Sequence, residues 1–314
     1  MIHEIVININ NQNTAVSSIL EKKNLKIEMQ VYDSAPLLYK KGTIVLIHGN
    51  SFSQKIFKDQ IKYFSTRYRV IALDLLGHGK STKINNCENL TIEEKNTLAQ
   101  ALYNPQTMIS SVTQVLQALQ VTRAHIIGWS LGGHFAYGVA VEDPGLVSTI
   151  TSIGSPPVNF SEAGITIGFS DWFINILIPE WIHEPKPYSA KKAAEICGNI
   201  GLKPEDTDSI ADMMTTDPLV RKYLFEKIKE YENPIYVKTS IDGENFVKCT
   251  NIPICLIVGK NDAGINIEYI SKFDTQLRNN LSRVHIIEDA PHAVFITHKK
   301  SYYNIVDHFI DSAP

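Results

Sequence analysis

One serine of this sequence lies in a setting that is typical of a nucleophile. The motif GWSLG, residues 128–132, places Ser130 between glycines, directly after a β-branched apolar run and directly before a helical pattern that ends ahead of Pro144. A strand, a sharp turn and a helix in this order present a serine hydroxyl at the end of a sheet. Glycines suit such a turn because a β-carbon would clash with the neighbouring strand and helix. The motif therefore predicts Ser130 as a nucleophile; the alternative is a small-residue turn that only joins a strand to a helix.

A serine hydroxyl reacts when a base accepts its proton and a carboxylate orients that base. Asp262 follows one apolar run and His292 follows the next, so both are expected at the ends of strands. The order Ser130, Asp262, His292 is a known chain order for a catalytic triad. We therefore predict His292 as the general base and Asp262 as its partner. Glu268 and Asp289 remain alternative carboxylates, and a plain surface-loop histidine is the alternative for His292.

The developing oxyanion needs amide donors, and a second strand end supplies a candidate. The motif HGNS, residues 48–51, follows another buried run, and the backbone amide of Asn50 is predicted to join that of Leu131 in an oxyanion hole. The Asn50 side chain could also meet the substrate. We interpret His48, and likewise Asp74 and His78 in the glycine turn DLLGHGKS, as structural. No nucleotide-binding glycine pattern accompanies them.

These residues need a framework, and the rhythm of the chain predicts an α/β fold. Apolar runs alternate with helical patterns, as in an eight-stranded, mostly parallel sheet with helices on both faces. One helix should begin at Asn104-Pro105, another at Ser130, and the last should bury Val306 and Phe309. The first two strands are expected to be antiparallel. The predicted strands are 2–9, 26–32, 43–48, 70–73, 124–127, 148–153, 254–258 and 283–287.

A long segment between two core strands breaks this rhythm. Residues 155–247 show helical patterns without strands, which predicts an inserted helical cap on a core made of residues 1–154 and 248–314. Caps of this kind cover the carboxyl ends of strands, where open α/β sheets bind ligands. Five aromatic side chains are candidates to line an acyl pocket, with ordinary core roles as the alternative: Trp129, Trp172, Phe173, Trp181 and Tyr188.

The composition limits the kinds of partner and the location that we expect for this protein. The 314 residues carry a formal net charge of −3, which gives no electrostatic reason to expect nucleic acid. No run approaches the roughly 18 apolar residues of a membrane span, and the first residues do not resemble a signal peptide. Four cysteines without a CxxC pair predict reduced thiols and a cytoplasmic location. We expect no metal, no cofactor and a small-molecule partner; the sequence does not predict the oligomeric state.

Together, these motifs resemble the α/β-hydrolase superfamily. The likeness rests on HGN, DLLGHGKS, GWSLGG, Asp262 and His292, and covers roughly residues 25–154 and 248–314. More narrowly, HGNSFS, LLGHGKST, GWSLGGH, GSPPV, CGN and RKYLFEKI resemble the metal-independent N-acyl-homoserine lactone hydrolases of that fold. That likeness reaches the cap at Cys197-Gly198 and at 221–228, and weakens over 161–188. It implies a lactone substrate.

The leading hypothesis is hydrolysis of a small carboxylic ester or lactone through an acyl-enzyme. Haloalkane dehalogenases and epoxide hydrolases of this fold carry an aspartate at the elbow, so Ser130 argues against both. Thioesterase, carbon–carbon hydrolase and cofactor-free peroxidase activities keep the serine and stay open. A non-catalytic small-molecule receptor is the alternative from another class.

Overall fold

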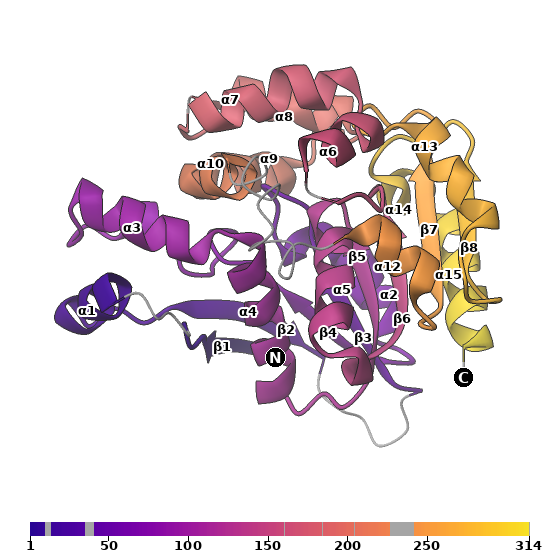
Figure 1. Cartoon of the computed structure of the whole chain (residues 1–314), viewed down its shortest axis with the longest axis horizontal. Coiled ribbons are helices and arrows are strands. Elements are labelled where there is room, and N and C mark those ends of the chain that lie inside the picture. Colours follow the sequence, from indigo (N-terminus) through magenta and orange to yellow (C-terminus); the bar gives the residue numbers. More distant parts are fainter. Residues whose placement is uncertain are drawn as a thin grey trace.

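An eight-stranded, mostly parallel sheet forms the centre of the molecule, as predicted (Figure 1). The structure is a computed structural model that describes residues 1–9, 14–34, 41–159, 161–183, 185–203, 205–226 and 242–313. The strand order is β1-β2-β4-β3-β5-β6-β7-β8. β1 pairs antiparallel with β2, β2 pairs antiparallel with β4, and all other pairs are parallel. The strands are β1 (Ile2–Val6), β2 (Glu28–Asp33), β3 (Thr43–Ile47), β4 (Arg69–Leu73), β5 (Ala124–Trp129), β6 (Val147–Ile153), β7 (Ile254–Gly259) and β8 (Arg283–Ile287).

The continuous apolar runs became the inner strands because both faces of a parallel sheet are covered. Every residue of β7 is buried, and in β3 only the first residue is partly exposed. The first strand is shorter than predicted. Its register with β2 ends at the pair Val6–Glu28, and the amide of Ile7 then makes one further bond to the carbonyl of Ile27. The prediction that this strand reaches residue 9 was therefore wrong.

Helices lie on both faces of the sheet (Figure 1). On one face α4, α5 and α12 pack together, and α5 contacts β5 and β6. On the other face α2 meets α15, where the rings of Tyr63 and Tyr303 stack with centroids 3.8 Å apart. The helices of this part are α1 (Thr14–Lys23), α2 (Lys58–Phe64), α3 (Ile92–Leu102), α4 (Pro105–Ala118), α5 (Leu131–Glu142), α12 (Gly243–Cys249), α13 (Ile267–Ser271), α14 (Val294–Thr297) and α15 (Lys299–Ser312).

Local sequence signals set several of these helix starts. The side chain of Asn104 accepts a hydrogen bond from the Thr107 amide at 3.0 Å, and Pro105 is the first helical residue of α4. The last helix buries Val306, Phe309 and Ile310, as its periodicity predicted. α1 has no counterpart among the predicted elements.

A group of helices between β6 and β7 gathers at one end of the molecule (Figure 1). α7 contacts α10, and α8 contacts α9. The last two residues of the RKYLFEKI motif, Lys227 and Ile228, lie outside the described residues. The helices are α6 (Glu162–Gly168), α7 (Ile178–His183), α8 (Ala190–Asn199), α9 (Thr207–Thr215) and α10 (Pro218–Glu226), with a π-helical turn over Phe173–Leu177.

Candidate active site

The turn after β5 holds Ser130 in a conformation that few side chains adopt. Its φ is 53° and its ψ is −121°, a strained, left-handed region of the backbone. The turn is closed so tightly that a β-carbon on Gly128 would lie 2.2 Å from the carbonyl oxygen of Gly132. The Ser130 amide donates to the Ile153 carbonyl at 2.8 Å, and the Ser155 hydroxyl donates to the Ser130 carbonyl at 2.5 Å. These two contacts to the end of β6 brace the strained residue.

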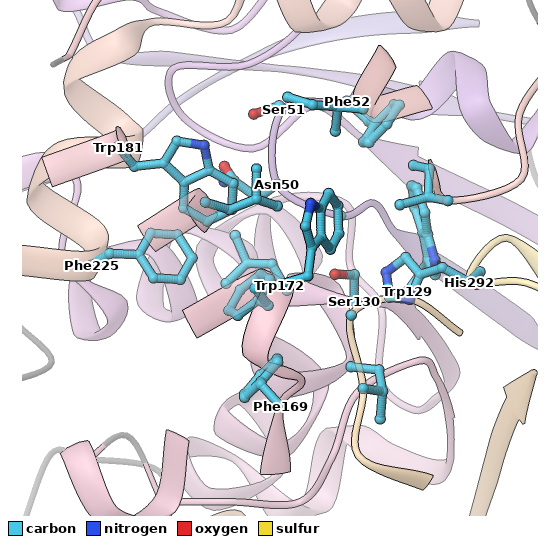
Figure 2. A pocket seen from close by; sticks show the side chains of 18 of the residues that line it. Asn50, Ser51, Phe52, Trp129, Ser130, Phe169, Trp172, Trp181, Phe225 and His292 are labelled. Atoms are coloured by element: carbon cyan, nitrogen blue, oxygen red, sulfur yellow. The ribbon is translucent and has the colours of Figure 1, made fainter. Parts of the chain in front are cut away.

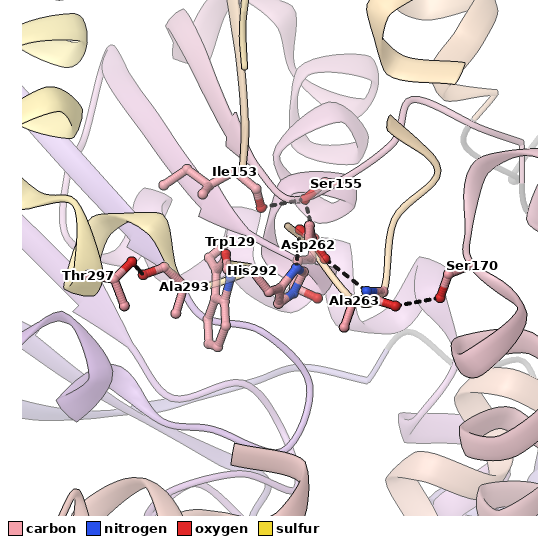
Figure 3. Close-up of polar contacts among 11 residues, drawn as sticks. Trp129, Ile153, Ser155, Ser170, Asp262, Ala263, His292, Ala293 and Thr297 are labelled. Carbon is pink, nitrogen blue, oxygen red and sulfur yellow. Dashed lines mark hydrogen bonds and ion pairs between the residues drawn. The ribbon is translucent and has the colours of Figure 1, made fainter. Parts of the chain in front are cut away.

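Asp262 and His292 form a buried pair. Nδ1 of His292 lies 2.7 Å from Oδ2 of Asp262 (Figure 3). The other carboxylate oxygen, Oδ1, accepts the amide of Gly264 at 2.9 Å. Because a carboxylate can only accept, the imidazole donates through Nδ1 and leaves Nε2 free for another partner. The backbone at Gly154 packs closely against the imidazole, since a β-carbon on Gly154 would lie 2.7 Å from Cε1 of His292. The alternative carboxylates Glu268 and Asp289 make no such contact with His292 within the described parts of the chain.

The backbone of His292 is also anchored. The indole Nε1 of Trp129 donates a hydrogen bond to the His292 carbonyl oxygen at 3.2 Å, and the two rings lie 5.4 Å apart between centroids (Figure 3). Trp129 is fully buried. The residue that precedes the predicted nucleophile therefore fixes the loop that carries the predicted base.

Ser130 and His292 line the same cavity (Figure 2). Among the described residues, no hydrogen bond joins the Ser130 hydroxyl to Nε2 of His292. Such contacts are often loose in a site without substrate and tighten when substrate binds.

The empty space in and around the cavity, its open mouth included, is about 750 Å³. Trp129, Trp172, Phe173 and Trp181 line it, as proposed from the sequence. Tyr188 is a correction, because its ring is not part of the lining. Its hydroxyl accepts a hydrogen bond from Nε1 of Trp181 at 2.5 Å, so it lies behind a lining residue.

Sequence reasoning missed much of the lining. Apart from His134 of α5, the missed residues come from loops and from helices of the inserted segment, whose side chains point to a common space only after the helices are placed. A weak signal was present for Ile196, Ile200 and Phe225, because they lie in or beside the CGN and RKYLFEKI motifs. The additional lining side chains are Ser51, Phe52, His134, Phe169, Leu177, Ile196, Ile200, Met213, Phe225 and Ile265.

The predicted oxyanion donors Asn50 and Leu131 both line this cavity. Leu131 is the first residue of α5, where backbone amides lack a partner within the helix. In the described part of the chain neither backbone amide has a hydrogen-bond acceptor. Two amides, one in the loop after β3 and one at the start of α5, therefore lack an acceptor at residues that line the same cavity as Ser130.

Other polar groups near the site have structural partners. His48 accepts the amide of Leu75 at 3.0 Å, and its other ring nitrogen lies 2.7 Å from the Gly49 carbonyl. Asp74 accepts the amides of Gln54 and Lys80. Burial lowers the pKa values of His48 and of His78, and it lowers the pKa of the lining residue His134 to about 3. These three histidines are therefore neutral at ordinary pH, which suits hydrogen-bonding roles.

The described residues contain no group of three or more histidine, cysteine or acidic side chains placed to hold a metal ion. All four cysteines are free, and Cys255 is buried within β7. No helix in the described ranges is both long and apolar enough to cross a membrane.

With this geometry in view, the comparisons define the class. A family profile described as "alpha/beta hydrolase fold" matches residues 42–299, so the chain belongs to the α/β-hydrolase family. Within it, the chain is 24% identical over 271 residues to a pimeloyl-[acyl-carrier protein] methyl ester esterase of Aliivibrio fischeri, a match that covers 85% of this chain and 93% of that protein.

Solved structures give the same fold. A variant of the N-acyl homoserine lactonase AidH, complexed with N-hexanoyl homoserine lactone, superposes with a TM-score of 0.77 at 23% identity and covers 99% of this chain and 97% of its own. An esterase from Rhodococcus sp. ECU1013 superposes with a TM-score of 0.71 at 17% identity, over 92% and 96% of the two chains. The relatives are thus named as esterases and as a lactonase.

Proposed function

We propose that this protein is a serine hydrolase that cleaves a small carboxylic ester or lactone through an acyl-enzyme. The observation that carries the proposal is the buried His292–Asp262 pair, 2.7 Å apart, on the same apolar cavity as Ser130 in its strained turn. Names of the relatives, an esterase and a lactonase among them, support the same class of reaction.

In the proposed reaction, the Ser130 oxygen attacks the carbonyl carbon of the substrate as its proton passes to Nε2 of His292. Asp262 holds the imidazole in the tautomer that can accept this proton and stabilises the imidazolium. The amides of Asn50 and Leu131 donate to the oxyanion of the tetrahedral intermediate. The intermediate collapses, the carbon–oxygen bond to the leaving alcohol breaks, and His292 returns the proton to that oxygen. A water molecule, activated by the same base, then hydrolyses the acyl-enzyme and regenerates Ser130.

The chemistry of the lining supports an uncharged acyl group in the cavity. Aromatic and aliphatic side chains surround it, and no Lys, Arg, Asp or Glu is among the described lining residues. A charged acyl group would lose its hydration without gaining a partner. Because a solved structure of this fold is an N-acyl homoserine lactonase, we propose an N-acyl-homoserine lactone as the finer substrate class. We also propose residues 155–247 as an inserted cap, in which α6 to α10 enclose the acyl chain.

The decisive variant is Ser130→Ala. It should abolish turnover of short activated esters, with the folded state unchanged by circular dichroism and thermal unfolding. A fluorophosphonate probe should label the parent at Ser130 and leave the variant unlabelled. Full activity in the variant would end the proposal. Tight binding of a small molecule without any labelling would favour a receptor instead.

A substrate panel tests the finer assignment. Lactones that carry an N-acyl chain should be opened faster than simple esters, thioesters and β-diketones of similar size. Chelators should leave the rate unchanged. Equal rates for lactones and simple esters would contradict the lactone assignment but keep the ester hydrolase.

A further inference from the structure

The loop that carries His292 is held at three points. Asp262 binds the imidazole, and Trp129 donates to the carbonyl oxygen of His292. The third contact comes from the inserted helices: the amide of the next residue, Ala293, donates to the carbonyl oxygen of Ile200 at 3.1 Å. Ile200 lies in the turn between α8 and α9, so this turn reaches directly to the predicted catalytic loop.

The same turn has no room for a side chain at its next residue. Gly201 has a φ of +87°, and a β-carbon there would lie 2.1 Å from Cγ and 2.6 Å from Cβ of Pro291. Pro291 directly precedes His292. Any side chain at position 201 must therefore displace the residue that leads into the predicted base.

The turn also faces the substrate cavity. The side chain of Ile200 is 6% exposed and is part of the cavity lining. Within this short turn, the side chain of Ile200 therefore lines the space proposed for the acyl group. The main chain of the same residue contacts the loop that carries His292.

We propose that the turn formed by Ile200 and Gly201 is a positioning element that sets where His292 stands relative to Ser130. This inference rests on the proposed function, in which His292 is the base. Proton transfer needs Nε2 of His292 within hydrogen-bond reach of the Ser130 oxygen. A misplacement of about 1 Å can lower a rate by about a hundredfold. The absence of a side chain at residue 201 is what lets Pro291 pack against the turn and keeps the base in place.

The test compares two glycines only three residues apart. Gly201→Ala adds a β-carbon that overlaps Pro291, whereas Gly198→Ala adds one that has no atom within 4 Å, on the exposed side of α8. With a short-chain ester, kcat of the Gly201 variant should fall by about tenfold to a hundredfold while KM stays within about twofold. The rate of fluorophosphonate labelling should fall in parallel. The Gly198 variant should match the parent in all three quantities.

A second variant covers the case in which Gly201→Ala does not fold. Pro291→Ala removes the Cγ and Cδ atoms that lie over Gly201, keeps Cβ and adds a backbone N–H. It should lower kcat by about threefold to tenfold without a matching rise in KM, because the loop loses one of its supports. If the Gly201 variant folds, Gly201→Ala should lower kcat by a smaller factor in the Pro291→Ala background than in the parent, because the overlap is partly removed.

The outcomes separate the two proposals. Activity that survives His292→Ala would overturn the proposed function itself. If His292→Ala is inactive but Gly201→Ala behaves like Gly198→Ala, or Pro291→Ala keeps the parent kcat, only the positioning role is overturned. A loss confined to KM would also overturn it, because that result would assign the turn to substrate binding alone.

Discussion

The indole of Trp129 hydrogen-bonds to the carbonyl oxygen of His292 at 3.2 Å, so the residue before the proposed nucleophile holds the backbone of the proposed base. These two residues are 163 positions apart in the chain. The contact links the end of β5 to the loop after β8. It explains why a large aromatic residue with an N–H group occupies the interior of the nucleophile motif.

Replacing Trp129 by Phe should therefore lower kcat more than it raises KM. The variant keeps an aromatic ring in the cavity wall but leaves the His292 carbonyl without this donor, a loss of about 1 kcal/mol. We expect kcat to fall by about fivefold to tenfold in steady-state kinetics. Phe295→Leu is the matched control, because it trims a ring that packs 5.3 Å from the same indole and leaves the hydrogen bond intact. Equal losses of kcat in both variants would assign the effect to packing instead.

Gly128→Ala should destabilise the fold by about 2–4 kcal/mol. Its new β-carbon would lie 2.2 Å from the carbonyl oxygen of Gly132, so strand β5 and helix α5 would have to move apart. Urea unfolding measures the effect. Gly145→Ala, whose β-carbon would meet nothing closer than 3.4 Å, should stay within about 0.5 kcal/mol of the parent. A similar stability for both variants would show that the turn tolerates a side chain.

Tyr188→Phe should change how the protein selects acyl chains. The substitution removes the hydroxyl that accepts from Nε1 of Trp181 and keeps the ring, over which the Arg221 guanidinium lies at 4.3 Å from the centroid. A buried N–H group without an acceptor costs about 1–3 kcal/mol, so the Trp181 side chain should reorient in the cavity.

We expect KM to rise for long-chain substrates and to remain unchanged for acetyl esters. Tyr223→Phe is the control, because the Tyr223 hydroxyl donates to Asn96 and its ring is not part of the described lining. A chain-length profile identical to the parent's would argue against a role of the Trp181–Tyr188 contact in shaping the pocket.

Asp212→Asn should remove a pH dependence of stability. Burial raises the pKa of Asp212 to about 6, and its carboxylate accepts a hydrogen bond from the Ser53 hydroxyl at 2.5 Å. Because the folded-state pKa lies above the ordinary value of 3.8, this group's contribution is fully present below about pH 4 and is lost as the pH rises through about 6.

The free energy of unfolding of the parent, measured relative to the variant, should therefore fall by on the order of 3 kcal/mol between pH 4 and pH 8. Chemical denaturation at several pH values measures this difference. Asp208→Asn, an exposed carboxylate on the same helix, should not remove the dependence. Parallel pH profiles for the parent and Asp212→Asn would contradict the prediction.

Much of the framework could be predicted because its signals are local. The inner strands were found because a parallel strand is buried on both faces and is therefore apolar throughout. The start of α4 was found because Asn104 and Pro105 act on the helix that they begin. The end of β1 is set by where its pairing with β2 stops, which the sequence pattern does not show. The predicted strand was therefore too long.

The sequence by itself determined the nucleophile motif and the chain order of Ser130, Asp262 and His292, since each lies next to a strand with a clear pattern. It favoured Asp262 but left Glu268 and Asp289 as alternatives, because all three lie shortly after neighbouring strands. That choice needed the tertiary structure, in which the ends of β7 and β8 lie side by side and bring only Asp262 to the imidazole. The lining of the pocket also required the tertiary structure. A buried aromatic ring can face the cavity, as Trp181 does, or lie behind a lining residue, as Tyr188 does, and the sequence does not distinguish the two.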